Sequence, residues 1–449
     1  MQKQIWAIII LIVLFLASAI GGFFVVSNRQ SPAGVELGQS LIIKEAPPVK
    51  EATESEDPGL KYIASEIERV AKVSAEVVAE AQKFIEEENE KKILINQALN
   101  KSSQVKGIYL NEFIANYQTP FAKASRENIK KMLQETELNG VVIDIKENNG
   151  PNLPDSLKAF IEELHQQDVW VIARICVFRD SSLREKKPEW YLKDSSATSS
   201  DNIWKDPAGA SWLDASSTEV QAYIVDFSKK AIDFGFDELQ FDYIRFPSDG
   251  KIKNIVYPFY DAKTEKYEVI GGFFSKLPRD LKEYKPSIIL SADLFGYLAT
   301  QFQSFDIGQR LLDAGKYFDY LSFMLYPSHF YGGFRVDYDE QRGLPALRLL
   351  YKDETTTSSL NLVSSNPYSV ILRSVLSSVD YLSAYGLTTK VRPWLQDFNL
   401  SYDVSRGIIY DVERVKAQIQ GAEDAGSAGW LLWNSANIYT EAALKKTGQ

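Results

Sequence analysis

The sequence predicts an α/β chain whose main body is a (β/α)8 TIM barrel, preceded by an N-terminal transmembrane helix, a disordered tether and a helical segment. Two observations lead to this fold class. From residue 105 onward, eight short apolar runs alternate with amphipathic stretches, as parallel strands and their helices would. Three long insertions, at 179–215, 247–270 and 327–366, each begin where an apolar run ends, and a barrel carries the loops of its active face there.

Residues 1–27 are predicted to be a transmembrane signal anchor. The stretch Ile5–Val26 is apolar and long enough to cross the ~30 Å of hydrocarbon in a bilayer. Lys3 precedes it, which favours a cytoplasmic N-terminus and places the rest of the chain outside the cytoplasm. Residues 17–19 also resemble a signal-peptide cleavage site, and cleavage would make the protein secreted. Because the apolar run continues to Val26, the uncleaved anchor is the favoured interpretation.

Two segments separate the anchor from the barrel. Residues 28–59 are rich in Ser, Pro, Glu and Gly and are predicted to be an acidic disordered linker. Residues 60–100 contain no Pro or Gly, and apolar side chains recur there at steps of three and four, which predicts one amphipathic helix. This helix would be either a coiled-coil stalk, through which the chain could self-associate, or a helix packed on the barrel.

The barrel domain is predicted over residues 105–445. Its expected strands are 105–110, 140–146, 169–178, 238–246, 288–293, 320–326, 390–396 and 429–433. The expected helices are 125–137, with Ser125 as N-cap, 155–167, 217–234, 271–284, 307–315, 368–385 and 411–425. A doubly wound open sheet is the second choice, but no Gly-x-Gly-x-x-Gly motif follows the first strand.

Composition restricts the chemistry. With 50 Lys and Arg against 60 Asp and Glu, the net charge is −10, so nucleic acid is not an expected partner. The chain has one cysteine, Cys176, and two histidines, His165 and His329, which excludes a disulfide within the chain and disfavours a zinc site of several His or Cys ligands. No metal or other cofactor is expected. Carboxylates are therefore the groups best able to carry chemistry.

Carboxylates stand at the ends of several expected strands. Asp242 ends the fourth strand and Asp293 the fifth, and Asp144 shares a face of the second strand with Lys146 by the period of two. A carboxylate buried in a strand needs a cation, and Arg245 and Lys146 are the expected partners of Asp242. A purely structural salt-bridge network is the alternative explanation of these charges.

Glycoside hydrolysis needs two carboxyl groups that flank the scissile bond, one ionised and one protonated, and this pattern fits it. Asp242 would be the nucleophile or base, and Asp293 would be the general acid with a raised pKa. Polar and aromatic side chains at the strand ends and in the first insertion would bind the sugar. They are Asp144, Lys146, Arg174, Arg245, Tyr326, His329, Gln396, Asp397, Trp204, Trp212 and Trp433. The last three would stack on sugar rings.

At these residues the sequence resembles the bacterial "putative glycosyl hydrolase" TIM-barrel domain. The most distinctive segment is Phe241-Asp242-Tyr243-Ile244-Arg245-Phe246-Pro247. Other matching segments are 136–146, 173–178, 187–190, 204–206, 212–214, 326–329, 392–398 and 429–434. The resemblance extends over roughly residues 105 to 440. It implies a sugar-cleaving barrel in which Asp242 and Asp293 are the catalytic acids at the ends of strands four and five.

The resulting hypothesis is an extracytoplasmic, membrane-anchored glycoside hydrolase that acts on a poly- or oligosaccharide. Two alternatives belong to other classes. A non-catalytic glycan-binding barrel of the cell envelope would depend on its tryptophans and not on its acids. A metal-dependent hydrolase would use Asp144, Asp242, Asp293 and His329 as ligands. The sugar, the linkage and the stereochemical outcome are left open by the sequence.

Overall fold

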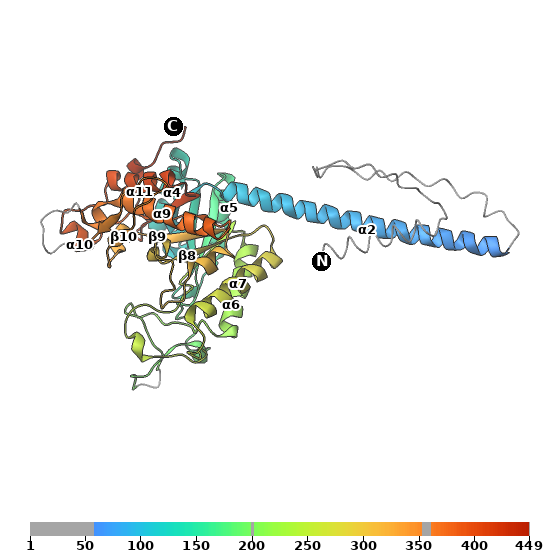
Figure 1. The fold of residues 1–449 in the computed structure, drawn as a ribbon, viewed down its shortest axis with the longest axis horizontal. Coiled ribbons are helices and arrows are strands. Elements are labelled where there is room, and N and C mark those ends of the chain that lie inside the picture. Colours follow the sequence, from blue (N-terminus) through green and yellow to red (C-terminus); the bar gives the residue numbers. More distant parts are fainter. Residues whose placement is uncertain (1–57, 199–201, 353–360, 449) are drawn as a thin grey trace. The chain divides into compact units, whose positions relative to one another are not determined.

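The computed structural model describes residues 58–198, 202–352 and 361–448 (Figure 1). It separates into two compact units, Met1–Glu80 and Ala81–Gln449. The predicted anchor and the predicted linker up to residue 57 lie outside the described residues. Among the helices that are described, none is both long and apolar enough to cross a bilayer.

The predicted helix before the barrel is α2 (Pro58–Ser102). Within the second unit, its last turn packs on the barrel: Ala98 and Leu99 pack against an apolar cluster of strand residues that includes Val105 and Trp170, and the Ser102 hydroxyl lies 2.8 Å from that of Tyr320. Further back, Phe84 and Leu94 are exposed. The stalk and packing interpretations of the helix as a whole both stay predictions.

The eight predicted strands form a closed parallel barrel. In chain order they are β1 (Val105–Leu110), β2 (Gly140–Glu147), β4 (Trp170–Cys176), β6 (Glu238–Asp242), β8 (Ile289–Leu294), β9 (Tyr320–Leu325), β12 (Lys390–Val391) with β13 (Trp394–Gln396), and β14 (Gly429–Trp433). Each strand pairs in parallel with the next, and β1 pairs with both β2 and β14, which closes the sheet. The predicted run 390–396 is divided between β12 and β13 at Pro393, whose nitrogen has no hydrogen to donate to a neighbouring strand.

The described helices of the barrel domain include the seven predicted ones, with shifted ends, and two short ones that were not predicted, at 112–116 and 401–404. They are α3 (Glu112–Asn116), α4 (Pro120–Glu135), α5 (Asp155–Gln166), α6 (Thr218–Phe234), α7 (Lys266–Tyr284), α8 (Leu311–Gly315), α9 (Pro367–Ala384), α10 (Ser401–Val404) and α11 (Val412–Asp424). The prediction that Ser125 is an N-cap is wrong. Thr119 caps α4 by accepting a hydrogen bond from the Ala122 amide, and Pro120 occupies the first turn, where its missing N–H costs nothing.

The insertions and the other segments that follow strands contain further short elements. These are β3 (Gly150–Pro151), β5 (Lys193–Asp194), β7 (Ile255–Val256), β10 (Phe334–Val336) and β11 (Leu347–Leu349), with 3-10 turns at Pro188–Trp190, Ile252–Asn254, Gly296–Ala299, Pro327–His329, Val363–Ser365 and Glu441–Ala443. The antiparallel pair of β5 and β7 joins the first insertion to the second, so the two form one layer.

A buried ion pair closes the opposite end of the barrel, where the strands begin. Arg392 Nη1 donates to both carboxylate oxygens of Glu238, at 2.9 and 3.0 Å, and both side chains are fully buried. Arg392 also donates to the Ser102 carbonyl and lies over the Tyr320 ring, 3.8 Å from its centroid. Trp170 Nε1 donates to the same Glu238 carboxylate. Each charge is therefore compensated, which burial requires.

Candidate active site

Arg174, on β4, is the centre of the candidate site. The strand register places it beside Asp144 of β2 and Gln240 of β6, so its side chain enters the barrel at the level of the strands' carboxyl ends. Its Nη1 donates to Asp144 and to Glu147, each at 2.5 Å. Its Nε and Nη2 both donate to Oδ2 of Asp242, the first at 3.1 Å.

A fourth carboxylate, Asp293 at the end of β8, lies 3.7 Å from the same Arg174 Nε through its Oδ2. The oxygens of Asp242 and Asp293 are therefore at most about 7 Å apart, inside the upper limit of about 9.5 Å for the carboxyl pairs of glycoside hydrolases. This agrees with the predicted proximity of the two side chains, and both are nearly inaccessible to solvent, at 4% and 1% exposure.

One guanidinium cannot neutralise four acids, and the pKa values reflect this imbalance. Burial raises the pKa of Asp144 to about 7; Arg174 opposes the shift and Glu147 adds to it. Burial also raises the pKa of Asp293 well above its usual range, and the negative charge of Asp242 adds to the effect. Of Asp242 and Asp293, Asp242 lies closer to Arg174, with an oxygen 3.1 Å from its Nε against 3.7 Å for Asp293. The site thus combines a carboxylate that is paired with a cation and a carboxyl group that favours its proton.

The backbone around Asp242 is strained. Tyr243 has φ +50°, in the left-handed region that bulky side chains avoid, and its amide donates to Asp242 Oδ1 at 2.6 Å. Such strain persists only where surrounding contacts enforce it. Asp293 is oriented differently, by a 2.8 Å hydrogen bond from Trp394 Nε1 to its Oδ1. Each acid therefore has one oxygen fixed by a donor outside the Arg174 cluster.

Aromatic rings form one wall of the cluster. Tyr109 and Trp433 are stacked with centroids 3.9 Å apart, and the Arg174 guanidinium lies 5.2 Å from the Trp433 ring. The Tyr109 hydroxyl donates to Asp144. Trp433 is partly exposed, and its role as a stacking platform stays a prediction.

Two predicted cations lie elsewhere. The register slips between Asp144 and Lys146, a β-bulge that breaks the period of two. Lys146 consequently bonds to Asp180 at 2.8 Å and to the Cys176 carbonyl at 2.7 Å, and its ammonium lies near the ring of Tyr223 in α6, in the helix layer. The prediction that Lys146 shares a face with Asp144 and pairs with Asp242 is wrong.

Arg245 was the other expected partner of Asp242. Its Nη1 donates to the Phe246 carbonyl and the Ser248 hydroxyl, and its guanidinium lies over the Trp212 and Tyr243 rings. The prediction that it pairs with Asp242 is also wrong, because Arg174 makes that ion pair. Arg174 was expected to bind sugar, not to pair with Asp242. Which basic side chain reaches Asp242 depends on the register between neighbouring strands.

The side chains predicted to bind sugar from strands six and seven are divided. Tyr326 is buried, and burial raises its pKa, with the negative charges of Asp293 and Asp242 adding to the effect. His329 packs against Tyr326 and Phe398, and burial lowers its pKa. Together with neighbours from the turn after β8, Tyr326 and His329 line a small pocket of about 90 Å³.

Gln396 and Asp397 are held by other parts of the protein. Gln396 exchanges hydrogen bonds with Ser328, through the backbone amide at 3.1 Å and the hydroxyl at 2.7 Å. Asp397 accepts from the amide and hydroxyl of Thr440, at 2.8 and 2.6 Å. Both side chains therefore position the loops after strands six to eight, and no unpaired donor of theirs is directed at the acids.

Trp204 and Trp212 are 1% and 2% exposed, so neither offers a free ring face, in contrast to the prediction that both stack on sugars. Trp204 Nε1 donates to the Lys251 carbonyl, and Trp212 Nε1 donates to Asp206. These rings are the core of the layer that the first two insertions build. Their aromatic character was visible in the sequence, but their burial results from contacts between two distant loops.

Sequence reasoning missed Tyr109 as a site residue. It precedes the last residue of β1, and its hydroxyl reaches Asp144 across the neighbouring strand. The period of two along β1 would have placed it on a barrel face, but a tyrosine in a strand is usually core.

Among the described residues, no group of three or more His, Cys, Asp and Glu side chains is arranged to hold a metal ion. The Arg174 guanidinium lies among the three aspartates proposed as ligands, which disfavours the metal-dependent alternative.

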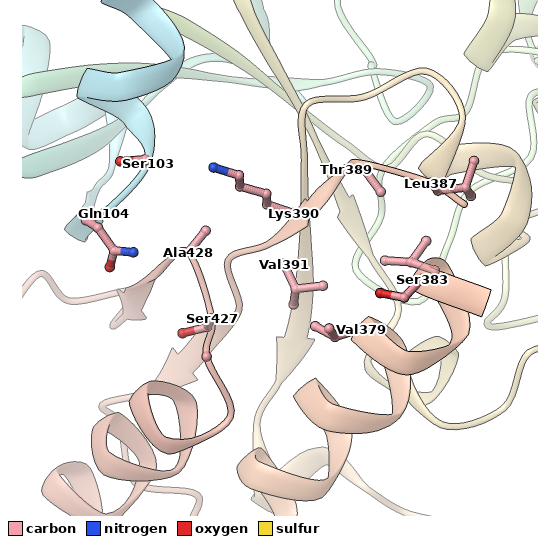
Figure 2. A pocket seen from close by; sticks show the side chains of 12 residues that line it. Ser103, Gln104, Val379, Ser383, Leu387, Thr389, Lys390, Val391, Ser427 and Ala428 are labelled. Atoms are coloured by element: carbon pink, nitrogen blue, oxygen red, sulfur yellow. The ribbon is translucent and has the colours of Figure 1, made fainter. Parts of the chain in front are cut away.

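Larger hollows also occur in the described part of the chain, and two of them border the barrel's ends. A cleft of about 410 Å³ lies beside Tyr243, between the first insertion and the segment after β6. A pocket of about 300 Å³ lies at the other end of the barrel, where Gln104, Lys390 and Ala428 precede or begin strands (Figure 2). Because the carboxylates stand at the strands' carboxyl ends, this second pocket is remote from them.

Comparison with known proteins identifies the family. Residues 151–439 match the family described as "Putative glycosyl hydrolase domain". The chain belongs to this family. The matched region contains Arg174, Asp242 and Asp293, whereas Tyr109 and Asp144 precede it. A search of curated proteins found no match.

Solved structures similar to the chain include a hypothetical protein, an α-galactosidase and an α-amylase. A hypothetical protein from Ruminiclostridium thermocellum ATCC 27405 is 28% identical over 41% of this chain and 96% of its own, with a TM-score of 0.34. The α-galactosidase of Thermus thermophilus is 14% identical over 76% of this chain and 60% of its own, with a TM-score of 0.44. The α-amylase of Geobacillus thermoleovorans is 12% identical over 77% and 75%, with a TM-score of 0.40.

Proposed function

We propose that the chain hydrolyses a glycosidic bond of a poly- or oligosaccharide with Asp242 and Asp293 as its two catalytic carboxyl groups. The observation that carries this proposal is the pair of contrasting environments around Arg174. Asp242 makes two hydrogen bonds to the guanidinium through one oxygen, whereas Asp293 is 3.7 Å from it, buried, and has a raised pKa. Family membership supports the same reaction class.

In this mechanism Asp293 is the general acid. It gives its proton to the oxygen of the leaving sugar as the bond from that oxygen to the anomeric carbon breaks. Asp242 acts in its ionised form, either by bonding to the anomeric carbon or by taking a proton from the attacking water. Arg174 donates two hydrogen bonds to one oxygen of Asp242, and the Tyr243 amide fixes its second oxygen. Water is the second reactant in both routes: it attacks the anomeric carbon directly, or it releases the sugar from Asp242 in a second step and returns a proton to Asp293.

The sugar would enter from the carboxyl ends of the strands. Trp433 is the candidate platform, because its ring is partly exposed and stands beside Arg174. Tyr326, which lies close enough to both acids for them to raise its pKa, would bind hydroxyl groups near the scissile bond. Loss of either aromatic ring would weaken substrate binding more than it slows the chemical step.

The extracytoplasmic location is part of the same proposal. Its support is the apolar stretch Ile5–Val26 with Lys3 before it. The substrate would then be a glycan of the cell envelope or of the surroundings. Protease digestion of intact cells that express the full chain tests this: a barrel that is protected until the cells are lysed would contradict the location.

The deciding experiment compares matched variants of the full-length chain on envelope and storage polysaccharides. We expect Asp242→Asn and Asp293→Asn each to lower the release of reducing ends by about 100-fold or more. Asp226→Asn, which changes an exposed aspartate of α6, should leave the rate unchanged. Because the pKa of Asp293 is raised, the wild-type rate should fall as pH rises through that value and the acid loses its proton. A substrate cleaved equally well by Asp242→Asn would contradict the mechanism.

Glycan binding without cleavage is the second candidate, favoured by the low exposure of both acids. In that case Asp242→Asn would bind glycans as well as the wild type does, Trp433→Ala would lose binding, and no polysaccharide would release reducing ends.

A further inference from the structure

The cleft beside Tyr243 has a charge that the proposed reaction does not use. It measures about 410 Å³, and its lining includes Arg179, Trp212, Tyr243 and Arg245. Tyr243 connects the cleft to the acids, because its ring lines the cleft while its amide holds Asp242. A group bound here would therefore lie next to the proposed scissile bond, and the volume suffices for about one sugar ring.

Arg245 is the unpaired cation of this cleft. Its Nη1 donates to two neutral acceptors, the Phe246 carbonyl at 3.0 Å and the Ser248 hydroxyl at 3.2 Å. Within the described part of the chain it forms no ion pair with a carboxylate, although it is only partly exposed. The rings of Trp212 and Tyr243 lie 5.2 and 5.3 Å from its guanidinium, so two aromatic rings rather than water surround the charge. Burial accordingly lowers its pKa.

The other charges of the cleft are accounted for. Arg179 pairs with Asp206 at 2.8 Å. Asp206 also accepts from Trp212 Nε1 and from the amides of Ala208 and Ala210, so its carboxylate has a full set of donors. Asp249 is exposed at the rim, where water screens its charge. The remaining guanidinium edge of Arg245 is thus the group that a ligand could pair with.

We propose that this cleft is a subsite for a sugar that carries a carboxylate, such as a uronic acid. The inference rests on the proposed function, since it names the class of glycan that the same site would cleave. The planar fork of an arginine binds a carboxylate through two parallel hydrogen bonds, and a partly desolvated site strengthens them. Arg179, whose guanidinium lies 5.3 Å from the centroid of the Tyr243 ring, is already paired with Asp206, so Arg245 is the cation left for the ligand.

Titration calorimetry of the full-length chain with glucuronic acid and with glucose tests this subsite. The two sugars differ only in a carboxylate against a hydroxymethyl group. We expect glucuronic acid to bind at least tenfold more tightly than glucose, Arg245→Gln to remove the preference, and Arg245→Lys to retain part of it. Arg335→Gln, which changes an exposed arginine on β10, is the matched control and should retain the preference.

Equal affinity of the wild type for the two sugars would overturn the inference, even if Arg245→Gln fails to fold. A preference that survives in Arg245→Gln would overturn it as well. Inorganic sulfate that binds as tightly as glucuronic acid would show a general anion site and would refute the carboxylate assignment. Asp242→Asn separates the two proposals: it should lose hydrolysis and retain the preference for glucuronic acid. A chain that cleaves only neutral glycans would leave the proposed function intact and refute the subsite.

Discussion

Asp144 should destabilise the folded protein at neutral pH, and replacing it should make the protein more stable. Its pKa is 3.8 in an ordinary environment and about 7 in the folded chain, where burial raises it. Each pH unit between these two values is worth about 1.4 kcal/mol, so ionised Asp144 costs the fold roughly 4 kcal/mol above pH 7. The folded state binds more protons than the unfolded state in this window. Its stability therefore decreases as pH rises from about 4 to 7.

The variant Asp144→Asn cannot ionise and should lose this dependence. We expect its free energy of unfolding to be close to that of the wild type at pH 4 and higher by up to roughly 4 kcal/mol at pH 8. Urea unfolding at a series of pH values measures the difference, with Asp226→Asn as the exposed control. A variant that is less stable than the wild type at pH 8, or a difference that does not change with pH, would refute the reasoning and show that Arg174 keeps Asp144 ionised without cost.

Two further substitutions test the barrel itself. Arg392→Met leaves the Glu238 carboxylate buried without its cation and should lower the free energy of unfolding by about 3–5 kcal/mol, measured in urea. The double variant Glu238→Leu with Arg392→Met should recover much of that loss. An Arg392→Met protein of wild-type stability would contradict the buried pair. Gly429→Ala should lower the free energy of unfolding by about 1–3 kcal/mol or more, because Gly429 has φ +82° and a Cβ there would overlap the Val105 carbonyl oxygen. An unchanged thermal midpoint would show that β14 approaches β1 less closely.

Such a cost at Asp144 is expected of a binding or catalytic site. Residues that hold charge in a poor environment are retained for what they do and not for stability. The same reasoning distinguishes the Arg174 cluster from the Glu238–Arg392 pair. One cation serves four acids in the first. In the second, each charge has an opposite charge as its partner, and each makes at least one further hydrogen bond, Glu238 with Trp170 and Arg392 with the Ser102 carbonyl.

The order of strands and helices could be predicted because it depends on local patterns. Runs such as 105–110 and 429–433 are mostly apolar and have the predicted bounds in the structure. The ends of the helices were less predictable. Ser125 and Thr119 are both good caps in isolation, and Pro120 favours the earlier one. Asp242 and Asp293 were recognisable as acids that close apolar strands, and parallel strands place them at one end of the barrel.

The sequence by itself determined the classes of group available: many carboxylates, two histidines, one cysteine, and a distinctive segment around Asp242. Only the tertiary structure decided which cation pairs with which acid. Lys146 and Arg245 are near Asp242 in the expected pattern, but a bulge in β2 and the strained backbone at Tyr243 direct them elsewhere, and Arg174 pairs with Asp242 from β4. The physical reason is that ion pairs inside a barrel depend on the register of neighbouring strands, and a shift of one residue changes the direction of every side chain that follows.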